Sequence, residues 1–184
     1  MSRGAATAGA EPAGLQRLQG LAPVIARDTR LLVLGSFPGE ASLRAQQYYG
    51  HPRNQFWPLL AAIWDVDLVA MSYPARLAEL RRRGVGLWDV YASCRRRGSL
   101  DSAIELPRPN DLASLHRRAP ALRVVAHNGG ESARSLRLVR ALGFEALRLP
   151  SSREVCLTTD FRPSISRRKE RRGTSVSIDI GARV

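Results

Sequence analysis

Residues 31–39 read LLVLGSFPG, and this stretch decides how the rest of the chain is interpreted. Leu31 to Leu34 form a continuous apolar run that ends at Gly35, a pattern typical of a strand buried on both faces of a parallel sheet. The loop that follows, from Ser36 to about Phe56, is long, and loops of that length are usually functional or disordered. Because this loop is rich in aromatic residues, which disordered segments avoid, we expect it to build a pocket.

Outward from residues 31–39, apolar runs alternate with segments of helical spacing. Further strands are predicted over 85–90, 122–126 and 144–149. Helices are predicted to begin near Trp57 and to span 73–83, 112–118 and 131–142. Alternating strands and helices predict an α/β fold, a three-layer sandwich with a central, mostly parallel four-stranded sheet flanked by helices. In such sheets the functional site lies at the carboxyl ends of the strands. This rule indicates the loops after Leu34, Val90, Ala126 and Leu149.

Composition divides the chain into three parts. Residues 1–25 are rich in Ala, Gly and Pro and are predicted to form a flexible arm. Residues 26–152 are predicted to form the α/β domain. Residues 153–184 are a divergent basic tail, whose charge run RRKERR at 167–172 suits either a flexible tail or a short edge strand.

Charge and cysteine content narrow the classes of function. The 184 residues carry a formal net charge of +13, and all 29 basic residues except Lys169 are arginine. This charge suits a polyanion partner such as nucleic acid, although an arginine-rich proteome would give the same excess. The two cysteines, Cys94 and Cys156, make neither a disulfide framework nor a metal-binding cluster. No apolar stretch is long enough for a membrane helix. Because the cysteine content is low, we expect a protein of the reducing cytoplasm, without a metal or a cofactor.

The segment YYGHPRNQFW at 48–57 follows GSFPG after a short spacer, and the joint presence of the two is specific. Together they resemble the uracil-DNA glycosylase superfamily, in particular its hypoxanthine-DNA glycosylase branch. Further pieces that fit the branch are LWDV at 87–90, Cys94, GSLD at 98–101, Asn110–Asp111 and HNG at 127–129. The resemblance covers roughly residues 28–152. It implies a monofunctional enzyme of base excision repair that hydrolyses the N-glycosidic bond of hypoxanthine or uracil in DNA.

The resemblance also implies roles for individual residues. Asn54, in the HPRN segment, would hold the attacking water, because Ser36 stands where many members have the catalytic Asp or Asn. The alternative for Asn54 is a cap on the helix that follows it. The residues predicted to bind the base are Phe37 and Tyr49 by stacking, Asn128 by reading the Watson–Crick edge, and Ser36. The residues predicted to bind DNA are His51, Arg53, Ser151 and Ser152. Core packing, local bonds or an Asn-Gly turn would also explain several of these side chains.

After Ser152 the sequence departs from the branch pattern, whose second motif grips DNA phosphates. The abrupt loss resembles a reading-frame shift, and a divergent tail would look the same. Two hypotheses therefore compete: an active glycosylase, and a glycosylase-like domain that binds DNA with weak or no activity. A nucleotide-binding α/β protein is a third, but neither a GxxxxGK[ST] nor a GxGxxG motif is present. The expected partner is double- or single-stranded DNA with a deaminated base, bound by a monomer.

The chain is predicted to release the base without cutting the DNA backbone. A lyase needs an amine that forms a Schiff base, and the single lysine, Lys169, lies in the tail. Incubation with a duplex that contains an abasic site should therefore leave the strand intact until alkali is added. Strand breaks without alkali, on a denaturing gel, would contradict this prediction.

Overall fold

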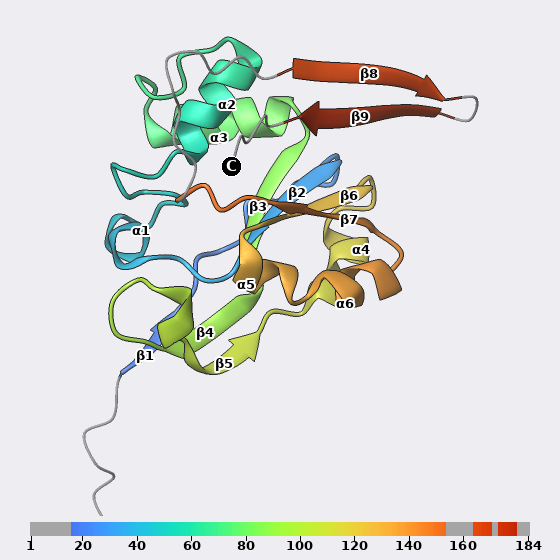
Figure 1. Ribbon diagram of the computed structural model, residues 1–184. Coiled ribbons are helices and arrows are strands. Elements are labelled where there is room, and N and C mark those ends of the chain that lie inside the picture. The colour runs from blue at the N-terminus through green and yellow to red at the C-terminus, as the bar shows by residue number, and fades with distance from the viewer. Residues whose placement is uncertain (1–15, 154–163, 171–172, 180–184) are drawn as a thin grey trace, which may run out of the picture.

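The computed structural model describes residues 16–153, 164–170 and 173–179. The central sheet has four parallel strands in the order β3-β2-β6-β7, namely β2 (Leu31–Gly35), β3 (Val85–Asp89), β6 (Val124–Asn128) and β7 (Glu145–Leu149). The predicted fold class is confirmed, since helices flank this sheet (Figure 1). The first of these strands along the chain, β2, lies inside the sheet between β3 and β6, and its apolar side chains are buried on both faces.

The helices form the outer layers. On one face lie α2 (Phe56–Trp64) and α3 (Tyr73–Arg82), and on the other lie α4 (Leu115–Arg118), α5 (Gly130–Ala133) and α6 (Leu136–Ala141) (Figure 1). A further short helix, α1 (Glu40–Ala45), lies inside the segment from Ser36 to about Phe56 that was predicted as one long loop.

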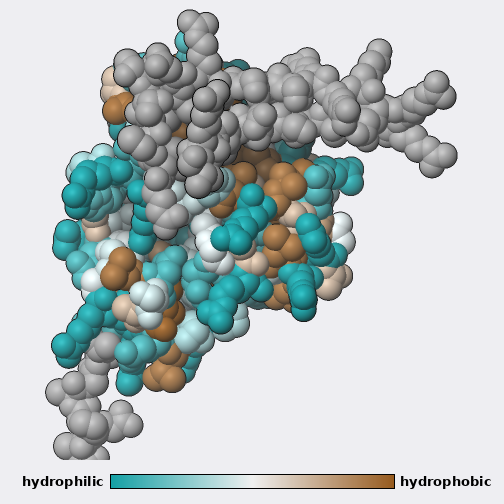
Figure 2. Space-filling model, in the orientation of Figure 1, coloured by the Kyte–Doolittle hydropathy of each residue, from teal (hydrophilic) through white to brown (hydrophobic). Residues whose placement is uncertain are grey.

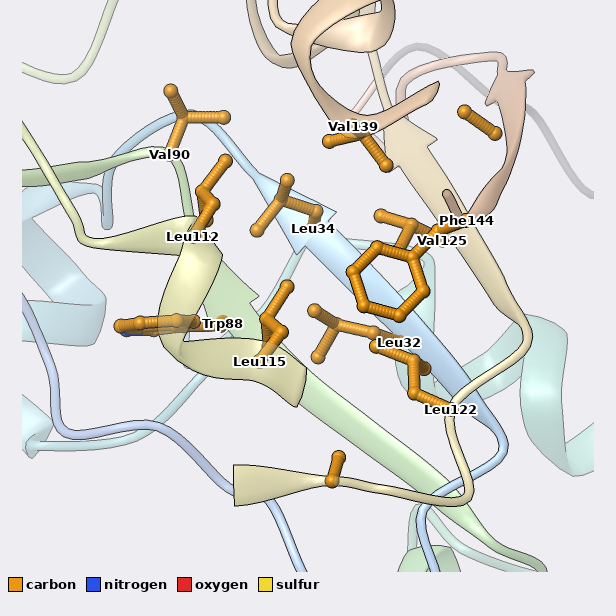
Figure 3. Close-up of a cluster of buried hydrophobic side chains, with 12 residues drawn as sticks. Leu32, Leu34, Trp88, Val90, Leu112, Leu115, Leu122, Val125, Val139 and Phe144 are labelled. Carbon is orange, nitrogen blue, oxygen red and sulfur yellow. The ribbon is translucent and has the colours of Figure 1, made fainter. Parts of the chain in front are cut away.

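A hydrophobic core lies on each face of the sheet. Side chains alternate along β2, so Leu32 and Leu34 face one core while Val33 faces the other. The core on the α4–α6 side, drawn in Figure 3, brings Leu32 and Leu34 together with Val125 and Val139. On the outside, hydrophilic side chains cover much of the face in Figure 2, with hydrophobic ones gathered on the side of α6 and β7.

A second sheet was not predicted from the sequence. It is antiparallel, with the order β1-β4-β5, and consists of β1 (Arg17–Gln19), β4 (Tyr91–Arg95) and β5 (Glu105–Pro109). β1 lies within 1–25, the stretch expected to be a flexible arm, while residues 1–15 lie outside the described part of the chain. Pairing with β4 orders a segment whose composition alone gave no sign of a strand.

The predicted helix at 131–142 is wrong in detail, because the chain forms α5 and α6 with a break at Arg134 and Ser135. The Ser135 hydroxyl donates to the Ser132 carbonyl at 2.8 Å, and the Ser135 N–H donates to the same oxygen at 3.1 Å. A serine that bonds locally in this way competes with the regular helical pattern. The predicted helix at 112–118 is likewise split, into a 3-10 turn, η2 (Leu112–Ser114), and α4.

In the basic tail, residues 164–170 and 173–179 form the strands β8 (Ser164–Glu170) and β9 (Gly173–Asp179), which pair with each other as an antiparallel hairpin. Residues 167–170 of the charge run lie in β8, and residues 171–172 lie outside the described residues. Cys156 and residues 154–163 lie outside the described residues.

The sheet core should depend on Leu34, whose side chain is fully buried in the strand that precedes the site. Leu34→Ala is expected to lower the free energy of unfolding by about 2–5 kcal/mol, because it leaves a cavity between sheet and helices. Leu138→Ala is the matched control, since Leu138 is 53% exposed, and it should change stability by less than about 0.5 kcal/mol. Urea denaturation measures both, and equal effects would contradict the prediction.

Candidate active site

A cavity of about 410 Å³ opens at the carboxyl ends of the parallel strands. Its walls come from the loop after β2, the end of β3, the end of β6 and the segment after β7. This is the position that the open-sheet rule predicts. All nine residues proposed from the sequence line it: Ser36, Phe37, Tyr49, His51, Arg53, Asn54, Asn128, Ser151 and Ser152.

The turn Gly35–Gly39 forms one wall, and Phe37 is its aromatic element. The Phe37 side chain is almost fully buried, and the Arg96 guanidinium lies over its ring at 5.1 Å from the centroid. Arg96 also donates from Nη2 to the carbonyl of Pro38, so one side chain holds both the turn and the ring. The arginine occupies one face of Phe37, and a planar base would therefore have to stack on the other.

Tyr49 forms a second aromatic wall. Its ring stacks on Phe56, with centroids 3.8 Å apart and an interplanar angle of 18°. Its backbone has φ of 56°, a left-handed conformation that is strained for a bulky residue and is often found at functional sites. Burial, the largest cause, raises the pKa of the Tyr49 hydroxyl above its ordinary value of 10.0, so this hydroxyl stays protonated at neutral pH.

Asn128 is the last residue of β6, although the sequence placed it just past the strand. Its Nδ2 donates to the Tyr49 hydroxyl at 3.1 Å and to Ser152 Oγ at 2.9 Å, while its Oδ1 accepts from the Ser152 N–H at 2.8 Å. Both amide hydrogens are thus engaged, and one lone pair of Oδ1 remains. Through these bonds Asn128 connects the end of β6 to Tyr49 and to the segment after β7.

Asn54 lines the cavity just before α2. Its Oδ1 accepts from the N–H of Phe56, the first residue of α2, at 2.9 Å. This local bond is an Asx turn that fixes the amide before the helix, whose N-cap position is Gln55 and not Asn54. One lone pair of Oδ1 and the Nδ2 hydrogens remain for a water or a substrate.

The mouth of the cavity is polar and basic. His51, Arg53 and Arg153 are exposed there. The His51 Nδ1 accepts from the Arg53 N–H at 3.1 Å, which is the local structural bond that a His before Pro often makes. Arg153 donates from Nη1 to the Ser99 carbonyl at 2.6 Å and bridges the segment after β7 to the loop after β4. The carbonyl of Ser152 accepts from the N–H of Gln55 at 3.0 Å, so this segment is docked at the site.

Comparison with known proteins gives the family. A family model described as "Uracil DNA glycosylase superfamily" matches residues 22–172. The chain belongs to this superfamily. Two curated relatives are named hypoxanthine DNA glycosylase. The one from Methanosarcina barkeri is 43% identical over 134 residues, which cover 73% of this chain and 85% of the relative. The one from Methanosarcina acetivorans is 39% identical over 134 residues, with the same coverage.

A solved structure has a similar fold. It is the solution NMR structure of a Methanosarcina acetivorans protein provisionally named a uracil DNA glycosylase, with a TM-score of 0.69 and 38% identity over 74% of this chain and 85% of that one. Membership in the superfamily confirms the class of enzyme that the two motifs predicted and does not favour the binding module. The family match also runs to residue 172, further than the 28–152 that the motifs covered.

Sequence reasoning missed a buried carboxyl group in this glycosylase site. Asp89 ends β3 beside Gly35, lines the cavity and is only 5% exposed. Burial, followed by the charge of Asp101, raises its pKa from 3.8 to about 7, against a smaller opposite effect of Arg96 and Arg153. Asp101 also lines the cavity and accepts from the Ser36 hydroxyl at 2.8 Å. The available signal was position, since Asp89 lies one residue before the end of the strand predicted over 85–90, and the strand ends were expected to meet.

Within the described residues, no helix is long and apolar enough to cross a membrane. Those residues also contain no group of three or more His, Cys, Asp or Glu side chains that could hold a metal ion.

The buried carboxyl of Asp89 should make stability depend on pH. Its pKa is higher in the folded protein, about 7, than its ordinary value of 3.8, so folding takes up a proton between these values. The stability contributed by the neutral carboxyl is present at low pH and is lost as pH rises through 7. Asp89→Asn does not titrate, so the free energy of unfolding of the wild type minus that of the variant should fall from about pH 5 to about pH 8. A difference that is constant across this range in urea titrations would contradict the expectation.

Proposed function

We propose that this glycosylase removes hypoxanthine from DNA, and uracil with it, by hydrolysis of the N-glycosidic bond. The observation that carries the proposal is the convergence on one cavity of the residues from GSFPG, HPRN and HNG, which lie far apart in the sequence. The cavity volume of about 410 Å³ lies within the range of small-molecule sites, about 300–1,000 Å³. The names of the relatives support hypoxanthine as the preferred base.

The base leaves the DNA stack and enters between the aromatic walls. Extrusion costs a few kcal/mol, and stacking on a protein ring returns about 1–3 kcal/mol per base. Phe37 and Tyr49 are the proposed stacking partners, since each has one face covered by the protein, by Arg96 and Phe56 respectively. Asn128 reads the edge of the base through its remaining lone pair, or through exchange of its bonds to Ser152.

Asn54 is the proposed residue that holds the attacking water. Its bond to the N–H of Phe56 prevents rotation of the amide, so a water bonded to it is held in one place. An amide is a weak base, and a weak base suffices where the glycosidic bond breaks early and the sugar becomes an oxocarbenium-like cation. The water then adds to the sugar carbon, and its proton passes to solvent or to the departing base.

DNA phosphates are proposed to contact the basic mouth. Arg53 and His51 lie on one side of it and Ser151 and Ser152 on the other. Salt should therefore weaken binding, because phosphate contacts release counterions. We further propose that the protein acts as a monomer in the cytoplasm, on double- or single-stranded DNA that contains a deaminated base.

Asn54→Ala is expected to lower the rate of base release by at least about 100-fold, since it removes the group that positions the water. The assay uses labelled duplexes with one deoxyinosine or one deoxyuridine, treated with alkali to reveal abasic sites. Gln55→Ala is the matched control, because Gln55 is the adjacent amide and its side chain bonds only to the Arg53 carbonyl.

If the wild-type protein binds both duplexes but cleaves neither, the proposed activity is wrong. The chain would then be a glycosylase-like domain that binds DNA without activity. Asn54→Ser separates the two roles of Asn54. A serine hydroxyl can accept the same local bond from the N–H of Phe56, so this variant should keep stability within about 1 kcal/mol of wild type. It should still lose activity, and full activity in Asn54→Ser would assign Asn54 to this local bond alone.

A further inference from the structure

Asp89 lies deeper in the cavity than any other charged side chain that lines it. It is 5% exposed, whereas Arg53 and Arg153 are exposed and Asp101 is half-buried. Its backbone is fixed by the ladder to β2 and by the Asn110 amide, which donates to the Asp89 carbonyl at 2.9 Å. The carboxyl is therefore part of the rigid end of the sheet.

The fold leaves room for this carboxyl at a specific place. A Cβ on Gly35 would lie 2.5 Å from Asp89 Oδ1, so the carboxyl occupies the space that any other residue would fill. The second oxygen, Oδ2, is buried and has no hydrogen-bond partner among the described residues. A buried polar atom without a partner is costly, and at a cavity it indicates a group kept for a ligand.

The depth of Asp89 decides which part of a nucleotide it could meet. The exposed basic side chains at the mouth suit the phosphates, and the phosphates, sugar and base follow one another into the cavity. The base therefore reaches the end of the sheet, where Asp89 lies beside the turn that carries Phe37. A carboxyl in that position meets the base rather than the sugar carbon or the attacking water.

We propose that Asp89 is a further catalytic residue, which in its neutral form donates a hydrogen bond from its carboxyl group to the extruded base and strengthens that bond as the base departs. This inference rests on the proposed function and adds a group that its mechanism does not contain. The base takes the electron pair of the glycosidic bond and becomes negatively charged, so a donor placed beforehand stabilises the transition state. If the proton transfers fully, the base leaves neutral and Asp89 regains a proton from solvent.

The surroundings of Asp89 keep its carboxyl group neutral below about pH 7. Burial and the negative charge of Asp101 raise its pKa to about 7, while Arg96 and Arg153 act in the opposite direction. The other titratable groups that face it are the hydroxyls of Tyr48 and Tyr49, whose pKa values are raised by burial and, less strongly, by Asp89 itself. An ionised Asp89 would repel both the carbonyl oxygens of the base and the anion that it becomes.

Ionisation of Asp89 should slow base release at high pH. Wild-type kcat should be level at low pH and fall tenfold per pH unit above about 7, where Asp89 loses its proton. Asp89→Asn keeps a donor in the amide Nδ2 and does not titrate, so this limb should disappear. The variant should be slower than wild type at about pH 6 and faster at about pH 9. Asp89→Ala, which has no donor, should lose about 100- to 1,000-fold at low pH.

Two neighbours test the electrostatics in opposite directions. Asp101→Asn removes the charge that raises the pKa of Asp89, so the midpoint of the falling limb should move to lower pH. Arg153→Gln removes a charge that lowers this pKa, so the midpoint should move to higher pH. The midpoint is the readout, because either substitution can also change the rate by altering the cavity wall.

The experiment is single-turnover release of hypoxanthine from a deoxyinosine duplex between about pH 6 and about pH 9, with circular dichroism to show that each variant is folded. Identical pH profiles for wild type and Asp89→Asn would overturn the proposal. So would a wild-type rate that rises with pH through 7 and is lost in Asp89→Asn at every pH, since that result makes Asp89 the base for the water.

A binding measurement tests the contact of Asp89 with the base even if the protein cleaves no duplex. A duplex with 2′-fluoro-deoxyinosine resists hydrolysis, and its affinity relative to an undamaged duplex is measured by fluorescence anisotropy. The excess affinity should fall above about pH 7 for wild type and stay constant for Asp89→Asn. An unchanged excess in both proteins would contradict contact of Asp89 with the base, whereas lack of cleavage with the expected binding contradicts only the proposed activity.

Discussion

The parallel ladder between β2 and β3 is the constraint on which the site depends. It places Gly35 opposite Asp89, so the turn that begins GSFPG starts beside a buried carboxyl. Only a glycine fits at this point, because a Cβ would lie 2.5 Å from Asp89 Oδ1. On the other side β2 pairs with β6, and Asn128 extends one residue beyond the paired His127. Three strand ends thus supply the floor of one cavity, and the apolar cores on both faces of the sheet keep them in register.

A network of hydrogen bonds connects the strand ends to the loops that line the cavity. Asn128 contacts Tyr49 and Ser152, and Ser152 accepts from Gln55, next to Asn54. Arg153 extends the same network to Ser99 across the mouth. The segment after β7, where the sequence leaves the pattern of the hypoxanthine branch, is therefore still joined to the site through residue 153.

Two carboxyl groups lie in one cavity and have different surroundings. Asp101 is bonded to the Ser36 hydroxyl, whereas Asp89 Oδ2 has no partner in the described chain. The charge of Asp101 adds to burial in raising the pKa of Asp89. Burial beside a like charge is a common way for enzymes to raise the pKa of an acid toward physiological pH. Here the pair would suit an enzyme whose product is an electron-rich base.

The sequence by itself determined the α/β class, the four parallel strands and the cavity-lining residues of GSFPG, HPRN and HNG. Those inferences rest on local patterns, namely apolar runs, helical spacing and specific motifs. Only the tertiary structure decided that β1 joins a second sheet, that Ser135 breaks the predicted helix, and that Asp89 lies in the cavity. Strand pairing and burial depend on neighbours far apart in the chain, whereas the Ser135 bond is local and interrupts a spacing that otherwise favours one helix. A carboxyl at a strand end looks like any other polar residue until the fold removes water from it.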